Sequence, residues 1–413
     1  MSTQEYKIKD IEKVVQIKGP IKNVKITRLT APGENYLSLV FRVDVQTDEN
    51  GQINNKSLVA KCIPPQNKDF LGINMISMRN EIEWYIDIVP LWDEYFEEYG
   101  ITESIFPKYY GSRIDNSDNG RPDMDCVLVL ENLNPLGYKN EDRYIGFDLN
   151  TTKAVLKRIS LFHAAPLGMK FVKPEKFKLL KDYIDSCRMA DKAFPEEPPP
   201  HDESESPSVT PESALIEAIK NIPECAEYVP KLVPFLSKIV TPADWNIEGE
   251  EPWSTISHND CWVNNIMIRV KDGEETLVKL VDFQMCGYKS FASDLVFFLL
   301  TSVRNEVLTE HFDELIRYYY DEFVNYLEKF QVNLKLSYEE YLLELKNAAQ
   351  TSEITHALIF SSIVFGEKGT GVDIAVEEFN PFIHLTKMIQ NMSDKQKRKI
   401  ITIATETTKR NWI

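Results

Sequence analysis

Three oxygen-bearing side chains in the middle of the chain have the types and spacing of a phosphoryl-transfer site. Asp260 lies in His258-Asn-Asp-Cys-Trp-Val-Asn-Asn265, and Asp282 follows in Leu280-Val-Asp-Phe-Gln284. In such sites one carboxylate orients the attacking hydroxyl and accepts its proton, while an amide oxygen and a second carboxylate hold Mg²⁺ on the phosphates. Hard oxygen ligands suit Mg²⁺. We therefore expect Asp260 to be catalytic and Asn265 and Asp282 to bind the metal.

Each of these residues has an ordinary explanation when it is taken alone. Asp260 could cap a helix, Asn265 could lie in a turn, and Asp282 could end a strand. The β-forming segments 264–270 and 276–282, separated by turn-forming residues, predict a hairpin. This hairpin would bring Asn265 and Asp282 together, so the set as a whole favours a phosphate site.

A lysine and a glutamate nearer the N-terminus complete this set. Lys61 ends the apolar segment Leu58-Val-Ala-Lys61, and Glu81 follows on a segment with helical periodicity. In kinases a strand lysine holds the α- and β-phosphates and pairs with a helix glutamate. Two solvent-facing charges are the ordinary alternative, but their order along the chain favours the pair.

Two further segments are candidates for nucleotide contacts. The segment 32–36 joins two expected strands and contains a single glycine. If it binds phosphates, Gly33 supplies backbone, and Asn35 or Ser38 supplies a side chain; a plain hairpin turn is the alternative. Glu131 and Leu133 follow the apolar run 126–130, and their backbone groups would bind an adenine ring.

Two polar residues near these motifs have structural explanations. His163 lies on an apolar helix, where a histidine with satisfied hydrogen bonds in the core is the favoured interpretation. Asp294 would cap the following helix or brace the catalytic loop. The aromatic pairs and triplets at 297–298 and 318–320 are typical of core.

The elements that must position these residues divide the chain into two parts. Strands over 24–29, 36–45, 57–62 and 126–130, with a helix over 76–99, predict a small α+β lobe covering residues 1–133. Residues 134–413 are mainly helical, with Thr151 or Thr152 as a helix cap and long helices over 306–330, 338–365 and 388–410. The acidic, proline-rich segment 194–211 predicts a mobile loop. The expected fold class is therefore α+β and two-lobed.

Composition excludes several other classes of protein. The formal net charge is −17, which opposes binding to nucleic acid. The longest apolar runs fall well short of the roughly 20 residues that span a bilayer, and residues 1–13 lack the apolar core of a signal peptide. The six cysteines form no CxxC pair, so reduced thiols in a cytoplasmic protein are expected.

Taken together, these motifs resemble the insect ecdysteroid kinase-like family, a branch of the choline kinase and aminoglycoside phosphotransferase group. The resemblance extends from about residue 33 to about residue 300 and is carried by Gly33-Glu-Asn-Tyr36, Val59-Ala-Lys61, Glu81-Ile-Glu-Trp-Tyr85, Leu130-Glu-Asn-Leu133, Leu161-Phe-His-Ala164, Ser257 to Met267, Val281-Asp-Phe-Gln284 and Ser293-Asp-Leu295. It implies a protein-kinase-like fold, ATP and Mg²⁺ as cofactors, and a small alcohol, either an ecdysteroid or a foreign compound, as acceptor. Asn259 departs from the glycine usual in the family.

Three other functions compete with this one. A choline-like amino alcohol is a second acceptor class, and a catalytically idle protein that binds a hydrophobic ligand is a third interpretation. The presence of Lys61, Glu81, Asp260, Asn265 and Asp282 argues against the idle protein. A protein kinase is disfavoured because H-R-D, D-F-G and A-P-E are missing from the sequence. No protein partner is implied.

Overall fold

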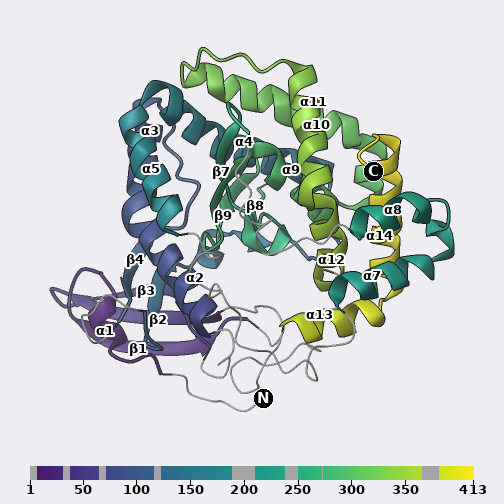
Figure 1. The fold of residues 1–413 in the computed structure, drawn as a ribbon. Coiled ribbons are helices and arrows are strands. Elements are labelled where there is room, and N and C mark those ends of the chain that lie inside the picture. Colours follow the sequence, from purple (N-terminus) through teal and green to yellow (C-terminus); the bar gives the residue numbers. More distant parts are fainter. Residues whose placement is uncertain are drawn as a thin grey trace.

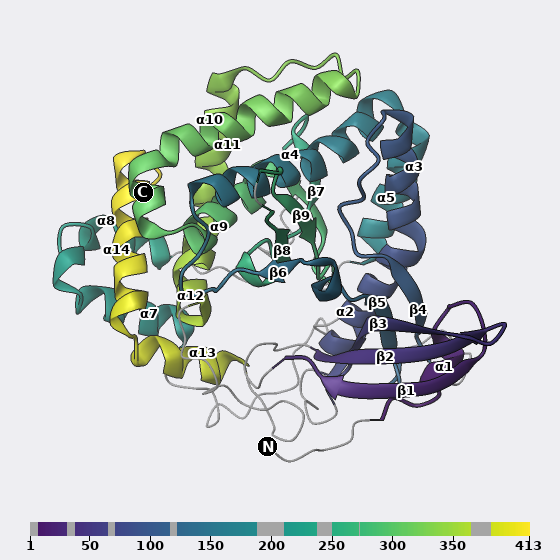
Figure 2. The same cartoon turned by 180° about the vertical axis from the view of Figure 1, so that it is seen from behind.

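The computed structural model describes residues 7–30, 38–64, 71–115, 122–187, 210–237, 250–271, 273–364 and 381–413. An antiparallel sheet lies at one end of the molecule, and a larger, mainly helical part lies beside it (Figures 1 and 2). The expected α+β class is confirmed.

Five strands among the described residues form the N-terminal sheet, in the order β1-β2-β3-β5-β4. Their bounds are β1 Ile21–Arg28, β2 Leu39–Glu49, β3 Gln52–Cys62, β4 Tyr109–Arg113 and β5 Val127–Glu131. Asn50 and Gly51, both at positive φ, join β2 to β3 in a two-residue turn. β3 therefore begins at Gln52, five residues before the predicted start at residue 57, because its first residues are polar and were assigned to the turn.

Apolar side chains on the two faces of the sheet contribute to two separate hydrophobic cores. Leu39, Phe41, Val43 and Val45 of β2 face a small core that also contains α1 (Ile11–Val14). In β5, Val127 and Val129 face this core, whereas Leu128 and Leu130 face a second, larger one. Because both faces of β5 are buried, its sequence is a continuous apolar run.

The larger core begins at the long helical segment that follows β3. α2 (Leu71–Glu83) and α3 (Val89–Glu98) are joined by a π-helical turn, Trp84–Ile88, where a single helix was predicted. Trp84 stacks on Phe283 at a centroid distance of 5.1 Å, and Trp92 stacks on Phe162 at 5.2 Å. The first of these contacts fixes the π-helical turn against the segment that contains Asp282.

The helical part is built from ten helices of eight or more residues in the described ranges. They are α4 Leu149–Val172, α5 Pro174–Ser186, α7 Pro211–Lys220, α8 Val229–Leu236, α9 Phe291–Ser302, α10 Asn305–Lys329, α11 Tyr338–Ala348, α12 Ile354–Val364, α13 Pro381–Gln390 and α14 Asp394–Lys409. A second π-helical turn, Ala349–Glu353, joins α11 to α12. None of the helices in these ranges is long and apolar enough to cross a membrane.

Several predicted boundaries in this part are wrong. Asp148, not Thr151 or Thr152, caps α4, because its side chain accepts the Thr151 N–H at 2.8 Å. The helix expected over 388–410 is two helices, since Ser393 caps α14 through a capping box. Pro211 begins α7 instead of ending a loop. The rest of that predicted loop, 194–209, lies outside the described residues.

Short strands lie between these helices and carry the motif region. β8 (Ile266–Arg269) pairs with β9 (Leu277–Leu280), which confirms the predicted hairpin. β6 (Lys139–Asn140) adds a third strand beside β8. β7 (Ser254–Ser257) pairs separately with β10 (Gly287–Ser290). Asp260 follows β7, and Asp282 follows β9.

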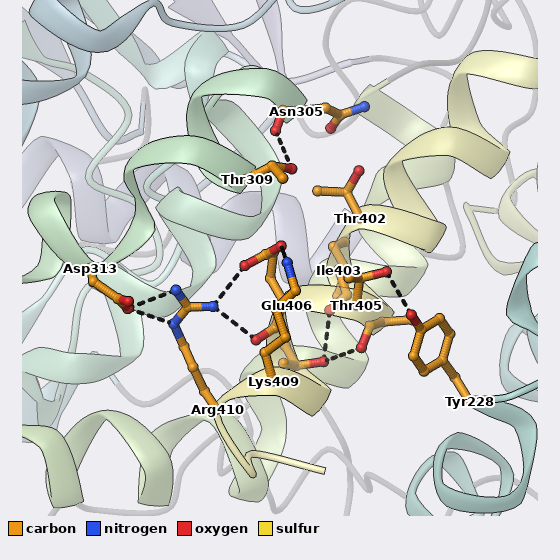
Figure 3. Close-up of polar contacts among 12 residues, drawn as sticks. Tyr228, Asn305, Thr309, Asp313, Thr402, Ile403, Thr405, Glu406, Lys409 and Arg410 are labelled. Carbon is orange, nitrogen blue, oxygen red and sulfur yellow. Dashed lines mark hydrogen bonds and ion pairs between the residues drawn. The ribbon is translucent and has the colours of Figure 1, made fainter.

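The C-terminal helix α14 is anchored to α10 by a polar cluster (Figure 3). Arg410 donates to Asp313 and to Glu406, each at 2.7 Å, and its guanidinium lies 3.8 Å from the Phe312 ring centroid. Lys399, also on α14, is fully buried, and its Nζ donates to the Val303 carbonyl at 2.7 Å. Burial lowers the pKa of Lys399 to about 7, although Glu306 opposes the shift.

We expect Lys399 to make stability depend on pH. Between pH of about 7 and about 10 the unfolded chain binds a proton on this side chain that the folded chain releases, so stability rises with pH in that window. Lys399→Met should remove this rise and increase the urea midpoint at neutral pH. Urea unfolding over this range, with exposed Lys397→Met as control, measures the effect. Identical pH profiles for wild type and Lys399→Met would contradict it.

Candidate active site

The side chain of Lys61 lies between two carboxylates from distant parts of the chain. Its Nζ donates to Glu81 Oε2 at 2.5 Å and to Asp282 Oδ1 at 2.7 Å. The side chains of Lys61 and Glu81 are 8% and 1% exposed, so this pair is almost fully removed from water. β3, α2 and the segment after β9 therefore meet at one cation.

The charges of this cluster favour a protonated lysine. Burial disfavours the charged form of Lys61, but Asp282 and Glu81 outweigh it and raise the pKa of the lysine. Burial is also the largest influence on Glu81 and raises its pKa, against the opposing effect of Lys61. Lys61 is thus a fixed positive charge at neutral pH.

Asp260 and Asn265 lie within one turn after β7. Asn265 Nδ2 donates to Asp260 Oδ2 at 2.7 Å and to the Asp260 carbonyl at 2.9 Å. Burial raises the pKa of Asp260 to about 7, and the nearby charge of Asp282 adds to this rise. The Val281 N–H donates to the Asn265 carbonyl at 3.0 Å, which ties the turn to the residue before Asp282. The hairpin therefore links the three motif residues, as the spacing predicted.

The carboxylate of Asp294 fixes the backbone at the start of this turn. Its two carboxylate oxygens accept the N–H groups of His258 at 2.5 Å and Asn259 at 2.8 Å. His163 Nε2 contacts the same carboxylate at 3.0 Å, and its Nδ1 contacts the Tyr319 hydroxyl at 2.7 Å. Asp294 is therefore not the cap of α9, a position that Ser290 takes, but a brace of the turn that leads to Asp260. His163 is the hydrogen-bonded core histidine that was expected.

Asn259 occupies a left-handed backbone position. Its φ is 61°, a region that glycine adopts freely and asparagine better than most other residues. Its side chain accepts the Ser257 hydroxyl at 2.7 Å and donates to the Met285 carbonyl at 2.9 Å. The structure thus accommodates asparagine where the family usually has glycine. Asp282 also lies at positive φ, 70°.

A residue that the sequence analysis missed braces the expected metal ligand. Asn140, on β6, donates through Nδ2 to the carbonyls of Asn264 at 2.7 Å and Ile266 at 3.1 Å. These two carbonyls flank Asn265 on either side. A single asparagine in a polar segment gives no signal of this role, because it depends on the pairing of β6 with β8.

The residues expected to contact a nucleotide are described only in part. Gly33 and Asn35 lie outside the described residues. Ser38 is buried just before β2, and Val40 two residues later pairs with Lys61 across the sheet. The Glu131 N–H is taken by the Lys108 carbonyl at 2.8 Å. Leu133, two residues after the end of β5, is buried, and its carbonyl accepts the N–H groups of Leu136 at 3.0 Å and Tyr138 at 3.2 Å.

The residues present fit a magnesium ion that is shared with phosphate. Asn265 and Asp282 offer an amide oxygen and a carboxylate, the hard donors that Mg²⁺ takes. Among the residues that the structure describes, no three His, Cys, Asp or Glu side chains gather as a metal-binding group. The described residues therefore do not form a metal site made of protein ligands alone. A Mg²⁺ ion that is bound to phosphate needs only one or two protein carboxylates.

Fold and site together define a kinase-like phosphotransferase, and sequence comparison agrees. The chain matches the model of the ecdysteroid kinase-like family over residues 32–332, well over half of its 413 residues. It therefore belongs to this family, and the resemblance inferred from its motifs is confirmed. No curated protein matches the chain significantly.

The solved structures that the chain is similar to include kinases of small molecules. An ethanolamine kinase of Plasmodium vivax is 11% identical, with 89% of this chain and 81% of that one covered and a TM-score of 0.39. A GDP complex of an aminoglycoside 2′-phosphotransferase of type IIIa is 10% identical, with 90% and 92% covered and a TM-score of 0.36. A microcompartment-associated aminopropanol kinase is 12% identical, with 84% and 94% covered and a TM-score of 0.30. These similarities are distant and transfer no residue roles to this chain.

We expect Asn140→Ala to weaken the metal site without unfolding the protein. Losing both contacts frees the backbone on either side of Asn265, so the Mg²⁺ concentration needed for half-maximal nucleotide binding should rise about tenfold. Calorimetric titration of nucleotide at several Mg²⁺ concentrations measures this. Asn134→Ala, near the same strand, is the control. An unchanged Mg²⁺ dependence would show that Asn140 is not a brace of Asn265.

Proposed function

We propose that this protein transfers the γ-phosphate of ATP, with Mg²⁺, to a hydroxyl group of an ecdysteroid-like or foreign small alcohol. The observation that carries the proposal is the buried Lys61 cation, held by Glu81 at 2.5 Å and by Asp282 at 2.7 Å. A strand lysine held by a helix glutamate is the arrangement that contacts the phosphates in kinases, and Asp282 is the carboxylate proposed to hold Mg²⁺ beside it.

Each candidate residue has a distinct part in this reaction. Lys61 offsets negative charge on the phosphates, and Glu81 holds the lysine in place. Asp260 orients the acceptor hydroxyl and accepts its proton at a carboxylate oxygen, while Asn265 and Asp282 hold the metal. When bound, Mg²⁺ supplies further compensation of phosphate charge. Most of the rate enhancement should come from positioning and electrostatics, because the transition state of phosphoryl transfer is loose.

The nucleotide would lie between the sheet and the helical part. Backbone groups of Gly33, the side chains of Asn35 or Ser38, and the segment Glu131–Leu133 are the proposed contacts. We place the boundary between the two lobes at residues 133 and 134, where β5 has ended and the helical part follows.

We place the reaction in the cytoplasm. Cys62, Cys126, Cys225 and Cys261 carry free thiols, which an oxidising compartment does not favour. Burial raises the pKa of Cys225 to about 11, so this thiol stays protonated and unreactive at neutral pH.

Asp260→Asn should lower kcat by at least about a hundredfold, because the amide cannot accept the hydroxyl proton. Affinity for Mg·ATP should remain within about twofold of wild type, since Asp260 faces the acceptor. Phosphate transfer from γ-labelled ATP to a panel of steroids, plant alcohols and amino alcohols, beside calorimetric titration of Mg·ATP, measures both.

Asp313→Asn, in the surface cluster on α10, is the matched control and should behave as wild type. Near-normal turnover by Asp260→Asn would refute the assigned role. A wild-type protein that binds no Mg·ATP at millimolar concentration would favour the idle binding protein, and transfer confined to amino alcohols would favour the choline-like class.

A further inference from the structure

Asn259 lies where β7 ends its pairing with β10. The two strands pair antiparallel, with Ser257 opposite Gly287. Two residues after Ser257 and two residues before Gly287, the same register places Asn259 opposite Met285. The Asn259 backbone does not continue the ladder, because its φ is 61° and its N–H donates to Asp294 at 2.8 Å. Its side chain continues the ladder instead, since Nδ2 donates to the Met285 carbonyl at 2.9 Å.

This contact is one of two ties between the segment that contains Asp260 and the segment that contains Asp282. In the other tie, the Val281 N–H donates to the Asn265 carbonyl at 3.0 Å. Asp260 directly follows Asn259, and Asp282 directly follows Val281, so each carboxylate lies one residue inside a tie. The two segments are therefore joined at both ends, and each carries one of the carboxylates.

The Asn259 amide is itself held between β7 and β10. The Ser257 hydroxyl, which is fully buried, donates to Asn259 Oδ1 at 2.7 Å. A methyl group added at Gly287 would lie 2.6 Å from Asn259 Nδ2, closer than unbonded atoms approach. Apart from its chain neighbours, the described residues place only Asn259 within 4 Å of that methyl group. Gly287 thus leaves the room that the amide occupies.

We propose that Asn259 is a positioning residue, which keeps Asp282, the proposed metal ligand, in place relative to Asp260, the proposed base. The proposal rests on the function proposed above, because phosphoryl transfer is what gives the two carboxylates these complementary parts. Asn259 acts through the Met285 carbonyl, three residues after Asp282, and touches neither reactant. A glycine at this position would adopt the same backbone angle freely but could not make the contact.

Asn259→Gly tests the proposal without straining the backbone. The Mg²⁺ concentration needed for half-maximal binding of a non-hydrolysable ATP analogue should rise about tenfold, because groups that orient metal ligands typically have effects of this size. Affinity for the analogue without Mg²⁺ should stay within about twofold of wild type. Calorimetric titration at several Mg²⁺ concentrations measures both. Asn50→Gly, in an exposed turn with a φ of 56°, is the matched control.

Gly287→Ala tests the same contact from the opposite strand. Its methyl group should displace the Asn259 amide and raise the Mg²⁺ requirement about as much as Asn259→Gly does. The double variant should be no worse than Asn259→Gly alone, because the group that the methyl displaces is already absent. Such non-additivity marks two changes that act through one contact. Hydrogen exchange of peptides covering residues 282–287, followed by mass spectrometry, should be faster in both single variants.

These measurements separate the contact from the function. A selective rise in Mg²⁺ requirement, with faster exchange over 282–287 and a non-additive double variant, supports the proposal. An Mg²⁺ requirement equal to that of Asn50→Gly overturns it, as do additive effects of the two changes. Equal loss of affinity with and without Mg²⁺ would indicate a general structural role and overturns it too.

A wild-type protein that binds no nucleotide would refute the kinase function by itself. Exchange over residues 282–287 then decides whether Asn259 holds that segment. Faster exchange in Asn259→Gly than in Asn50→Gly would uphold the positioning contact, and equal exchange in the two variants would overturn it.

Discussion

One buried cation links the parts of this molecule. Lys61 comes from the sheet, Glu81 from α2 and Asp282 from the segment after β9, and the lysine contacts both carboxylates within 2.7 Å. Taking three charges out of water is unfavourable, and removing one partner from a buried pair typically costs about 3–5 kcal/mol. The cluster therefore requires the sheet, the helix and the hairpin to keep their relative positions. Trp84 stacks on Phe283, the residue after Asp282, and this apolar contact helps to keep the helical segment and the hairpin in the same relative position.

The turn that contains Asp260, the proposed catalytic residue, has its own support besides the Lys61 cation. Asn259 and Asp282 both have positive φ, which is unfavourable for side chains other than glycine and asparagine or aspartate. Asp294 holds the first of these positions through two backbone N–H groups, and Asn140 holds the backbone around Asn265. The oxygens proposed to meet phosphate, metal and hydroxyl thus lie on a backbone that is fixed by side-chain hydrogen bonds from other elements.

The sequence was enough to predict the site residues that lie close together in the chain or belong to a distinctive motif. Asp260 and Asn265 share one turn, and apolar runs flanking a polar turn were enough to predict β8 and β9. It failed where the deciding contact was distant. Asn140 acts through the β6–β8 pairing. For Asp294 a helix cap and a brace of the loop were both expected, and the choice stayed open because that loop precedes it by more than thirty residues. The start of α4 was missed because Asp148 and Thr151 are both suitable caps and lie close together in the sequence. The breaks between α2 and α3 and between α11 and α12 were missed because a π-helical turn leaves the apolar pattern unchanged.

The central claim is that Lys61 is a phosphate-binding cation and not merely a buried charge, and Lys61→Met tests it most directly. This change keeps the length of the side chain and removes its charge, and Glu81→Gln should give the same defect more weakly by leaving the lysine poorly held. Calorimetric titration of folded Lys61→Met with Mg·ATP should show affinity at least about tenfold below wild type, since a charge-assisted contact contributes about 1.5–3 kcal/mol. Affinity equal to that of wild type, in a variant whose melting temperature shows that it is folded, would contradict the phosphate role of Lys61.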